Sequence, residues 1–100
     1  DDAHAAERRA IFAAKRAVLR RPFEELGYRV VGSRAGIYLW VEVDDDLVAT
    51  ERLLAGGVVV SPGRICGAGG EGYIRLALVP TLEESQQAAE VLQSCLSPAN

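Results

Sequence analysis

The sequence predicts an α+β fold: a small sheet of about four strands, antiparallel or mixed, with helices packed on one face. Strand-like runs occur in directly adjacent pairs, and helical stretches separate the pairs, which gives the order α-β-β-α-β-β-α. The chain has 100 residues, of which 49% are apolar and 25% charged, and these values are typical of one soluble domain with a single modest core.

The first predicted helix covers residues 3–21, which are rich in alanine and contain no glycine or proline. Its apolar stripe is expected to consist of Ala3, Ala6, Ala10, Ala14, Ala17 and Val18. Pro22 lacks a backbone N–H, so we expect it to kink the helix or to restart it with "PFEEL". Gly27 is the expected C-terminal glycine of this segment.

Four runs are predicted to be strands. "YRVV" (28–31) and "IYLWVEV" (37–43) form the first pair, joined by "GSRAG". "VVV" (58–60) and "YIRLAL" (73–78) form the second pair. All four are rich in β-branched or aromatic residues, which pack well on a pleated surface.

Two further helices have recognisable ends. "DDD" (44–46) supplies N-cap candidates for a helix over 47–55, and Gly56 and Gly57 end it. The last helix follows "PT", with Thr81 as N-cap and Glu84 three residues later, the pattern of a capping box.

Charge and apolar run length argue against several classes of partner. The net charge is −3, although residues 1–34 carry most of the basic side chains. Few aromatic residues accompany those charges, which favours a solvated helix face over a nucleic-acid surface. No apolar run is long enough to span a bilayer, and the chain opening does not resemble a signal peptide. We therefore expect a cytoplasmic protein without nucleic-acid or membrane partners.

Cysteine and histidine are too few for a metal centre. His4 is the only histidine, and Cys66 and Cys95 lie far apart without metal-ligand spacing, so no metal site is expected. Two reduced thiols are the favoured interpretation, and a disulfide stays open at this point.

The glycine-rich segment "GAGGEG" (67–72) is weighed as a phosphate cradle or as a hairpin connection. Phosphate-binding loops of this kind precede a helix, whereas here a predicted strand follows, and Glu71 would repel an anion. The pattern favours a flexible hairpin connection.

Arg75 is the residue in the next strand that raises a functional question. Side chains alternate along this strand, so Ile74, Leu76 and Leu78 share one face while Arg75 points to the other. An exposed arginine on a sheet is one interpretation. The other is a site for a carboxylate, because a guanidinium offers two parallel N–H bonds at the spacing of the two oxygens.

At this point "GSRAGIYLWVEV", "VVVSPGRICGAGGEGYIRLAL" and a final helix that begins "TLEE" resemble the C-terminal small domain of fold-type I, pyridoxal-phosphate-dependent aminotransferases of class I/II. The nearest resemblance is to the actinobacterial succinyldiaminopimelate aminotransferase group. The resemblance covers essentially residues 1–100, and it implies one small domain from a longer chain. One departure is Cys66, where the family often has an aromatic residue, and it is expected to be a packing residue rather than a nucleophile.

The resemblance implies a function for Arg75 and for the absent remainder of the enzyme. Arg75 would bind the carboxylate of an amino-acid or 2-oxo-acid substrate in an amino-group transfer, one candidate being diaminopimelate in lysine biosynthesis. Pyridoxal phosphate would be held by a lysine of the large domain, so this chain alone would contain neither catalytic nor cofactor-binding residues and would be inactive. Lys15, the only lysine, is expected to be a solvated charge. The full-length enzyme is expected to be a homodimer.

Two other classes of function remain open on the residues alone. One is a free-standing α+β regulatory or amino-acid-binding module without catalysis. The other is an interaction domain whose strand edges and apolar helix faces bind a partner.

Overall fold

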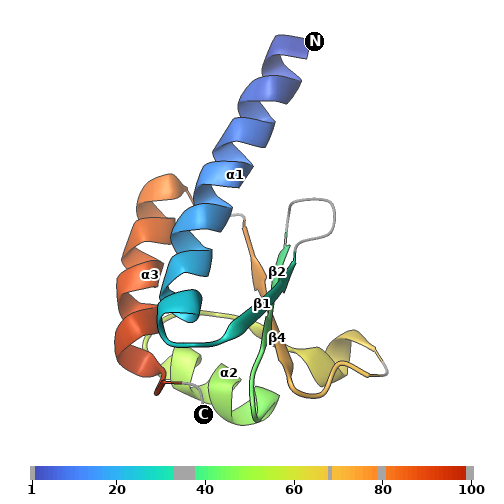
Figure 1. The fold of residues 1–100 in the computed structure, drawn as a ribbon, viewed down its shortest axis with the longest axis vertical. Coiled ribbons are helices and arrows are strands. Elements are labelled where there is room, and N and C mark those ends of the chain that lie inside the picture. Colours follow the sequence, from blue (N-terminus) through green and yellow to red (C-terminus); the bar gives the residue numbers. More distant parts are fainter. Residues whose placement is uncertain (1, 33–37, 68, 79–80, 99–100) are drawn as a thin grey trace.

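The predicted order of elements is confirmed in a computed structural model that describes residues 2–32, 38–67, 69–78 and 81–98 (Figure 1). The fold class is α+β, as predicted. Most of the expected "GSRAG" connection lies outside the described residues.

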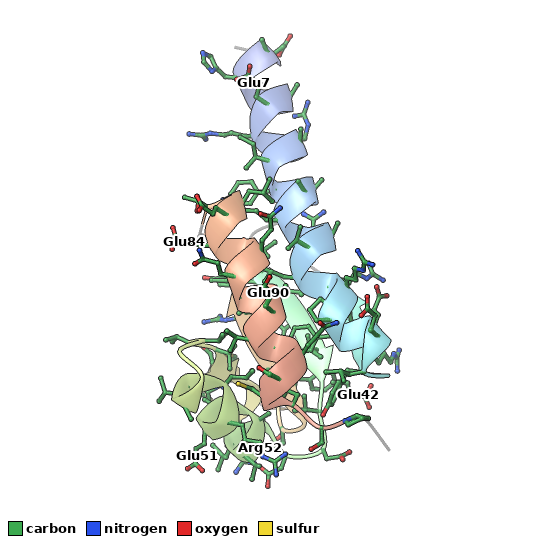
Figure 2. The ribbon with its side chains drawn as sticks, turned by 90° about the vertical axis from the view of Figure 1, so that its left-hand side faces the viewer. Glu7, Glu42, Glu51, Arg52, Glu84 and Glu90 are labelled. Carbon is green, nitrogen blue, oxygen red and sulfur yellow. The ribbon has the colours of Figure 1, made fainter. Side chains whose placement is uncertain are left out.

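The helices are α1 (Asp2–Glu25), α2 (Asp46–Ala55) and α3 (Leu82–Cys95). Figures 1 and 2 show α1 and α3 side by side against the sheet, with the first half of α1 extending beyond it. The shorter α2 packs against α3 and against the strands at the other end of the molecule. Among the described residues, α1, α2 and α3 therefore cover one face of the sheet and leave the opposite face open.

The sheet has the strand order β1-β2-β4-β3, and every neighbouring pair is antiparallel. The strands are β1 (Arg29–Gly32), β2 (Tyr38–Glu42), β3 (Ser61–Pro62) and β4 (Tyr73–Ala77). Of the two predicted arrangements, an antiparallel or a mixed sheet, the antiparallel one is therefore observed. Because β4 lies between β2 and β3, it is hydrogen-bonded along both edges.

The core lies between the helices and the inner sheet face. Buried and partly buried residues alternate along β2 and β4, as strand geometry requires. The core side chains with 0% exposure are Phe23, Leu39, Val41, Leu53, Ile74, Leu78 and Leu92. The predicted inward face of "YIRLAL" is thus confirmed.

Helix ends follow the signals in the sequence. Asp45 caps α2 by accepting hydrogen bonds from two backbone N–H groups, and the Thr81 hydroxyl accepts the N–H of Glu84 at the start of α3. At Gly27 and Gly57, with φ of 87° and 90°, the chain leaves α1 and α2 in the left-handed conformation. Each of these ends was predicted from its residue type.

Helix α1 differs from the prediction in two ways. The helix continues through Pro22 to Glu25, so of the two predicted outcomes, a kink or a restart at Pro22, the restart is wrong. The proline is itself buried, and Phe23 beside it is 0% exposed, so packing of this turn offsets the lost backbone hydrogen bond. The alanine stripe is also wrong, since Ala3, Ala6, Ala10 and Ala17 are exposed. Larger side chains decide which face packs, namely Phe12, Lys15, Leu19, Pro22 and Phe23.

Lys15 is buried, and its prediction as a solvated charge is wrong. Its side chain is 8% exposed, and its ammonium lies 5.1 Å from the centroid of the Phe12 ring. Nζ also donates to the carbonyl oxygen of Leu78, at 3.5 Å. The aliphatic stem of lysine packs among apolar groups while the ammonium contacts a ring face and a carbonyl, which is how a cation occurs at this depth.

The predicted strand "VVV" is also wrong. Val58 and Val60 are buried and Val59 is 75% exposed, an alternation typical of extended chain, but none of them belongs to a strand of the sheet. Pairing between β3 and β4 involves Ser61 and Pro62, directly after this run. Hydrophobic alternation reports which side chains are inside, whereas a strand also requires a hydrogen-bonded neighbour.

Candidate functional site: the open face of the sheet

Arg75 lies in the middle of the open sheet face, as the alternation predicted. Its Cα partners are Trp40 on β2 and Ser61 on β3, so it belongs to one of the two central strands, which are paired on both sides. Directly opposed residues of an antiparallel pair point to the same face, which puts Trp40 and Arg75 side by side. The sequence thus positions this guanidinium on a central strand of the sheet.

The guanidinium of Arg75 is stacked and available for a ligand. Its Cζ lies 4.4 Å from the centroid of the Tyr38 ring, a cation–π contact that restrains the plane of the group. Among the residues that the structure describes, the Arg75 side chain has no hydrogen bond or ion pair, and its ring contact is with Tyr38. Its side chain is half-buried, so a fork of N–H donors is presented at a partly sheltered surface.

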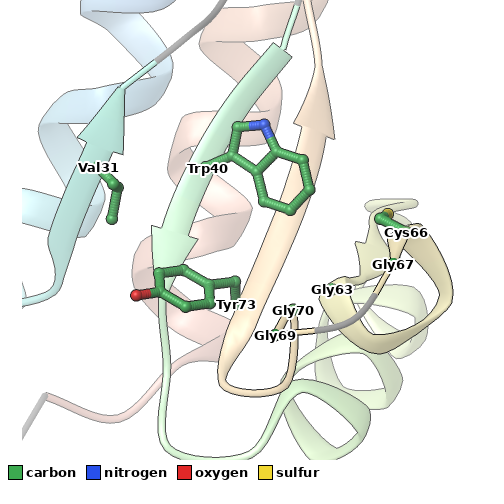
Figure 3. A pocket seen from close by; sticks show the side chains of 8 residues that line it. All are labelled: Val31, Trp40, Gly63, Cys66, Gly67, Gly69, Gly70 and Tyr73. Carbon is green, nitrogen blue, oxygen red and sulfur yellow. The ribbon is translucent and has the colours of Figure 1, made fainter.

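A pocket of about 270 Å³ opens on this face (Figure 3). Its walls are Val31, Trp40, Cys66 and Tyr73, together with backbone at Gly63, Gly67, Gly69 and Gly70. Figure 3 shows the Trp40 and Tyr73 rings standing on neighbouring strands, with the glycine segment along one side. Arg75 is not part of the wall and lies beside it, next to Trp40.

The glycine segment is held by close contact between two glycines. A Cβ on Gly63 would collide with the carbonyl oxygen of Gly70, and a Cβ on Gly70 would collide with that of Gly63. Gly63 begins a short 3₁₀ turn, η2 (Gly63–Cys66), which separates β3 from the glycine segment 67–72, and β4 follows that segment. A strand rather than a helix comes after the glycines, which agrees with a hairpin connection and not with a phosphate cradle.

The η2 turn is bound to the start of α2 by an ion pair between Arg64 and Asp46. Nη2 of Arg64 donates to Oδ1 of Asp46 at 2.6 Å, and Nε lies 3.0 Å from Oδ2. The backbone N–H of Arg64 donates to the same carboxylate, at 3.2 Å. The Asp46 side chain is 0% exposed, whereas that of Arg64 is 40% exposed. Hydrogen bonds from the Arg64 side chain lower the pKa of Asp46 from 3.8 to about 2, against the opposing effect of burial.

Sequence reasoning does not find this pair. The "DDD" pattern predicts only a capping role for Asp46, and it gives Arg64 no role at all. The two residues are 18 positions apart, in segments of different type, and no local spacing rule connects them. Only the tertiary arrangement of α2 and η2 brings them together.

The remaining candidate residues have no catalytic arrangement within the described ranges. Cys66 is exposed and Cys95 partly buried, both as free thiols, and the Cys66 thiol lies 3.8 Å from the Pro62 carbonyl oxygen, to which it donates. In the described part of the chain, no three histidine, cysteine or acidic side chains are grouped as metal ligands. Nor does that part contain a helix long and apolar enough to cross a membrane.

Comparison with known proteins identifies the family. The model of the aminotransferase class I and II family matches residues 1–92, and the chain therefore belongs to this family. It is 38% identical, over 90 residues, to the 4-dedimethylamino-4-oxo-anhydrotetracycline transaminase of Streptomyces rimosus, covering 89% of this chain and 25% of that protein. It is 34% identical, over 94 residues, to an LL-diaminopimelate aminotransferase of Dehalococcoides mccartyi, covering 90% and 24% respectively.

Solved structures agree with this assignment. A probable N-succinyldiaminopimelate aminotransferase from Thermus thermophilus is 32% identical with a TM-score of 0.75, over 86% of this chain and 24% of that one. The aspartate aminotransferase of Thermus thermophilus with maleate is 26% identical with a TM-score of 0.81, over 95% and 25%. The chain thus spans about a quarter of the length of the relatives it matches. Family membership favours an enzyme domain over a free-standing regulatory or interaction module.

Proteins of this family are generally dependent on pyridoxal phosphate. The described residues do not fit that cofactor. Lys15, the only lysine of the sequence, is buried on α1 with Nζ donating to the Leu78 carbonyl oxygen. It belongs to the helical layer rather than to the open sheet face, so the only lysine of the sequence is not on the face that carries Arg75.

Proposed function

We propose that residues 1–100 form the C-terminal small domain of an aminotransferase, in which Arg75 binds the carboxylate of the substrate. The reaction moves an amino group from an amino acid to a 2-oxo acid, and both reactants carry the carboxylate that a guanidinium recognises. The observation that carries the proposal is a guanidinium on a central strand, stacked on Tyr38 in the open face and without an ion-pair partner in the described ranges.

The contribution of this domain is binding and orientation. Two parallel N–H bonds fix the plane of a carboxylate as well as its position, which a point charge does not do. Tyr38 restrains the guanidinium before the substrate arrives, so less side-chain entropy is lost on binding. A substrate held in this way has fewer unproductive orientations, and that lowers the barrier to reaction.

Pyridoxal phosphate is proposed to be held outside this chain, by a large domain of the same polypeptide. The cofactor supplies the electron sink that makes amino-group transfer possible. The buried position of Lys15 supports this division, because residues 1–100 offer no other lysine. This chain alone is accordingly expected to be inactive, and the full-length enzyme is proposed to be a cytoplasmic homodimer.

The substrate is proposed to be an amino acid of the diaminopimelate type, as in lysine biosynthesis. Support comes from the relatives named as LL-diaminopimelate and N-succinyldiaminopimelate aminotransferases. The relative named as an anhydrotetracycline transaminase is the specific alternative, with a large ring ketone as amino acceptor. Assays of the full-length enzyme with both kinds of substrate separate the two.

The test of the carboxylate site uses Arg75→Lys and Arg75→Ala in the full-length enzyme. Both variants lose the bidentate fork, while lysine keeps the charge. We expect kcat/KM for the amino donor to fall by roughly ten- to a thousand-fold in both. Cofactor absorbance and folding should be retained, because the Arg75 side chain projects from the sheet face opposite the core. An Arg75→Ala enzyme that is folded and keeps the wild-type kcat/KM would refute the proposal.

A further inference from the structure

The ion pair between Asp46 and Arg64 is the best-connected polar contact outside the carboxylate site in the described ranges. The arginine side chain and its own backbone N–H both bind one carboxylate. Side chain and main chain of the η2 turn are therefore fixed to the first turn of α2 together. A surface ion pair between two flexible side chains would not restrain the backbone in this way.

Stability alone does not account for this arrangement. Asp46 is 0% exposed, and burying a carboxylate is costly unless it is fully paired. Apolar residues at such positions often stabilise a protein as much or more. What the pair adds is directional: the fork determines where η2 lies relative to α2.

The position of η2 in turn determines one wall of the pocket. Gly63, the first residue of the turn, is in backbone contact with Gly70, and Cys66, its last residue, lines the pocket with Trp40. Glu71, which follows Gly70, also acts favourably on the charge of Arg64. The carboxylate that binds the Arg64 guanidinium is therefore that of Asp46, and Glu71 adds a weaker electrostatic attraction.

We propose that Asp46 and Arg64 are positioning residues that hold the η2 wall of the pocket against Trp40 and thereby set which substrate side chains fit. The inference rests on the proposed function, because a carboxylate bound by Arg75 directs the rest of the substrate across the face that Trp40 shares with it. The pocket wall is mainly apolar, with two aromatic rings, a valine and a thiol. The methylene chain of a diaminopimelate-type substrate, or an aromatic side chain, is the kind of substrate portion that such a wall accommodates.

The test compares two amino donors of different size in the full-length holoenzyme. L-Alanine and L-phenylalanine are tried first, and kcat/KM is measured for two donors that the wild-type enzyme accepts. Arg64→Ala should lower the kcat/KM ratio of the large to the small donor by about ten-fold, because only the large donor reaches the wall. Arg64→Lys, which keeps the charge without the fork, should restore part of the ratio. Arg21→Ala, which removes an exposed ion pair with Glu25 on α1, is the matched control and should leave the ratio unchanged.

A second readout follows the turn itself by amide hydrogen exchange. In Arg64→Ala and in Asp46→Asn, residues 63–66 should exchange about ten-fold faster while residues 38–42 of β2 keep their protection. If Arg64→Ala fails to fold, Arg64→Lys and Asp46→Asn carry the same test.

The outcomes separate this inference from the proposed function. An unchanged donor ratio, or an equal loss for both donors, overturns the positioning role even if Arg75→Lys is impaired. Unchanged exchange at residues 63–66 also overturns it. An Arg75→Lys enzyme with wild-type kcat/KM refutes the carboxylate site instead, whatever Arg64→Ala does.

Discussion

Replacement of Gly63 by alanine tests whether the backbone contact with Gly70 is required for the fold of the glycine segment. The added Cβ would lie 2.7 Å from the carbonyl oxygen of Tyr73, whereas ordinary Cβ contacts begin at 3.4 Å, and it would also overlap the carbonyl oxygen of Gly70. Both obstacles are backbone atoms, one in β4 and one in the glycine segment. Neither can turn away as a side chain would, so the turn must move.

The expected cost is at the upper end for overpacking, about 3 kcal/mol. For a domain of this size, that corresponds to a fall in Tm of roughly 12–24 °C. The matched control is Gly69→Ala. Gly69 has a φ of 83° and nothing within 4 Å of an added Cβ, so only backbone strain of about 1 kcal/mol applies. Thermal unfolding of the 100-residue chain, followed by circular dichroism, measures both. If Gly63→Ala melts with Gly69→Ala or above it, the close packing of Gly63 and Gly70 is refuted.

Three further predictions concern other contacts. Asp46 has a folded pKa of about 2 against an ordinary 3.8, so its ionised form stabilises the fold above pH 4, and this contribution disappears as the pH falls through 2. In urea unfolding, the difference in free energy of unfolding between wild type and Asp46→Asn should therefore close from pH 6 to pH 2. A constant difference would contradict this prediction. Lys15→Met keeps the buried stem, so its free energy of unfolding should lie within about 1 kcal/mol of wild type, whereas that of Lys15→Ala should fall by about 2 kcal/mol. Equal losses of the two variants in chemical denaturation would show that the ammonium contacts, not the stem, stabilise the fold. The isolated chain exposes Val59 (75%) and Leu54 (59%), so it should self-associate in sedimentation experiments. Val59→Ser should reduce this association, and a strictly monomeric wild-type chain would contradict the prediction.

The elements that sequence predicts well here are those with a local chemical signature. Thr81 and Asp45 define helix starts and Gly27 and Gly57 define helix ends, because caps and left-handed glycines satisfy backbone groups within a few residues. Strand β4 and the outward direction of Arg75 follow from alternation alone. These features need no knowledge of distant parts of the chain.

The failures have the opposite character. Lys15 is buried with its ammonium over the Phe12 ring and hydrogen-bonded to the Leu78 carbonyl just after β4, and the helical position of a lysine does not reveal that environment. Alternation in "VVV" predicts a strand, yet among the described residues no strand pairs with it. Pro22 remains inside α1 because tertiary packing offsets its local cost. The Asp46–Arg64 contact joins residues 18 apart in sequence, which no periodic pattern encodes.

The separation of Arg75 from the pocket wall has a consequence for how such a domain diversifies. The guanidinium stands on a strand paired along both edges, while Cys66 and the glycines belong to a connection outside the sheet. Substitutions in the connection leave the strand register unaltered, so, under the proposed function, the preference for the substrate side chain can change while the carboxylate site at Arg75 is kept. A sheet built in this way tolerates substitutions at its edge, by natural drift or by directed mutagenesis of Cys66 and its neighbours, and keeps the Arg75 guanidinium on its central strand.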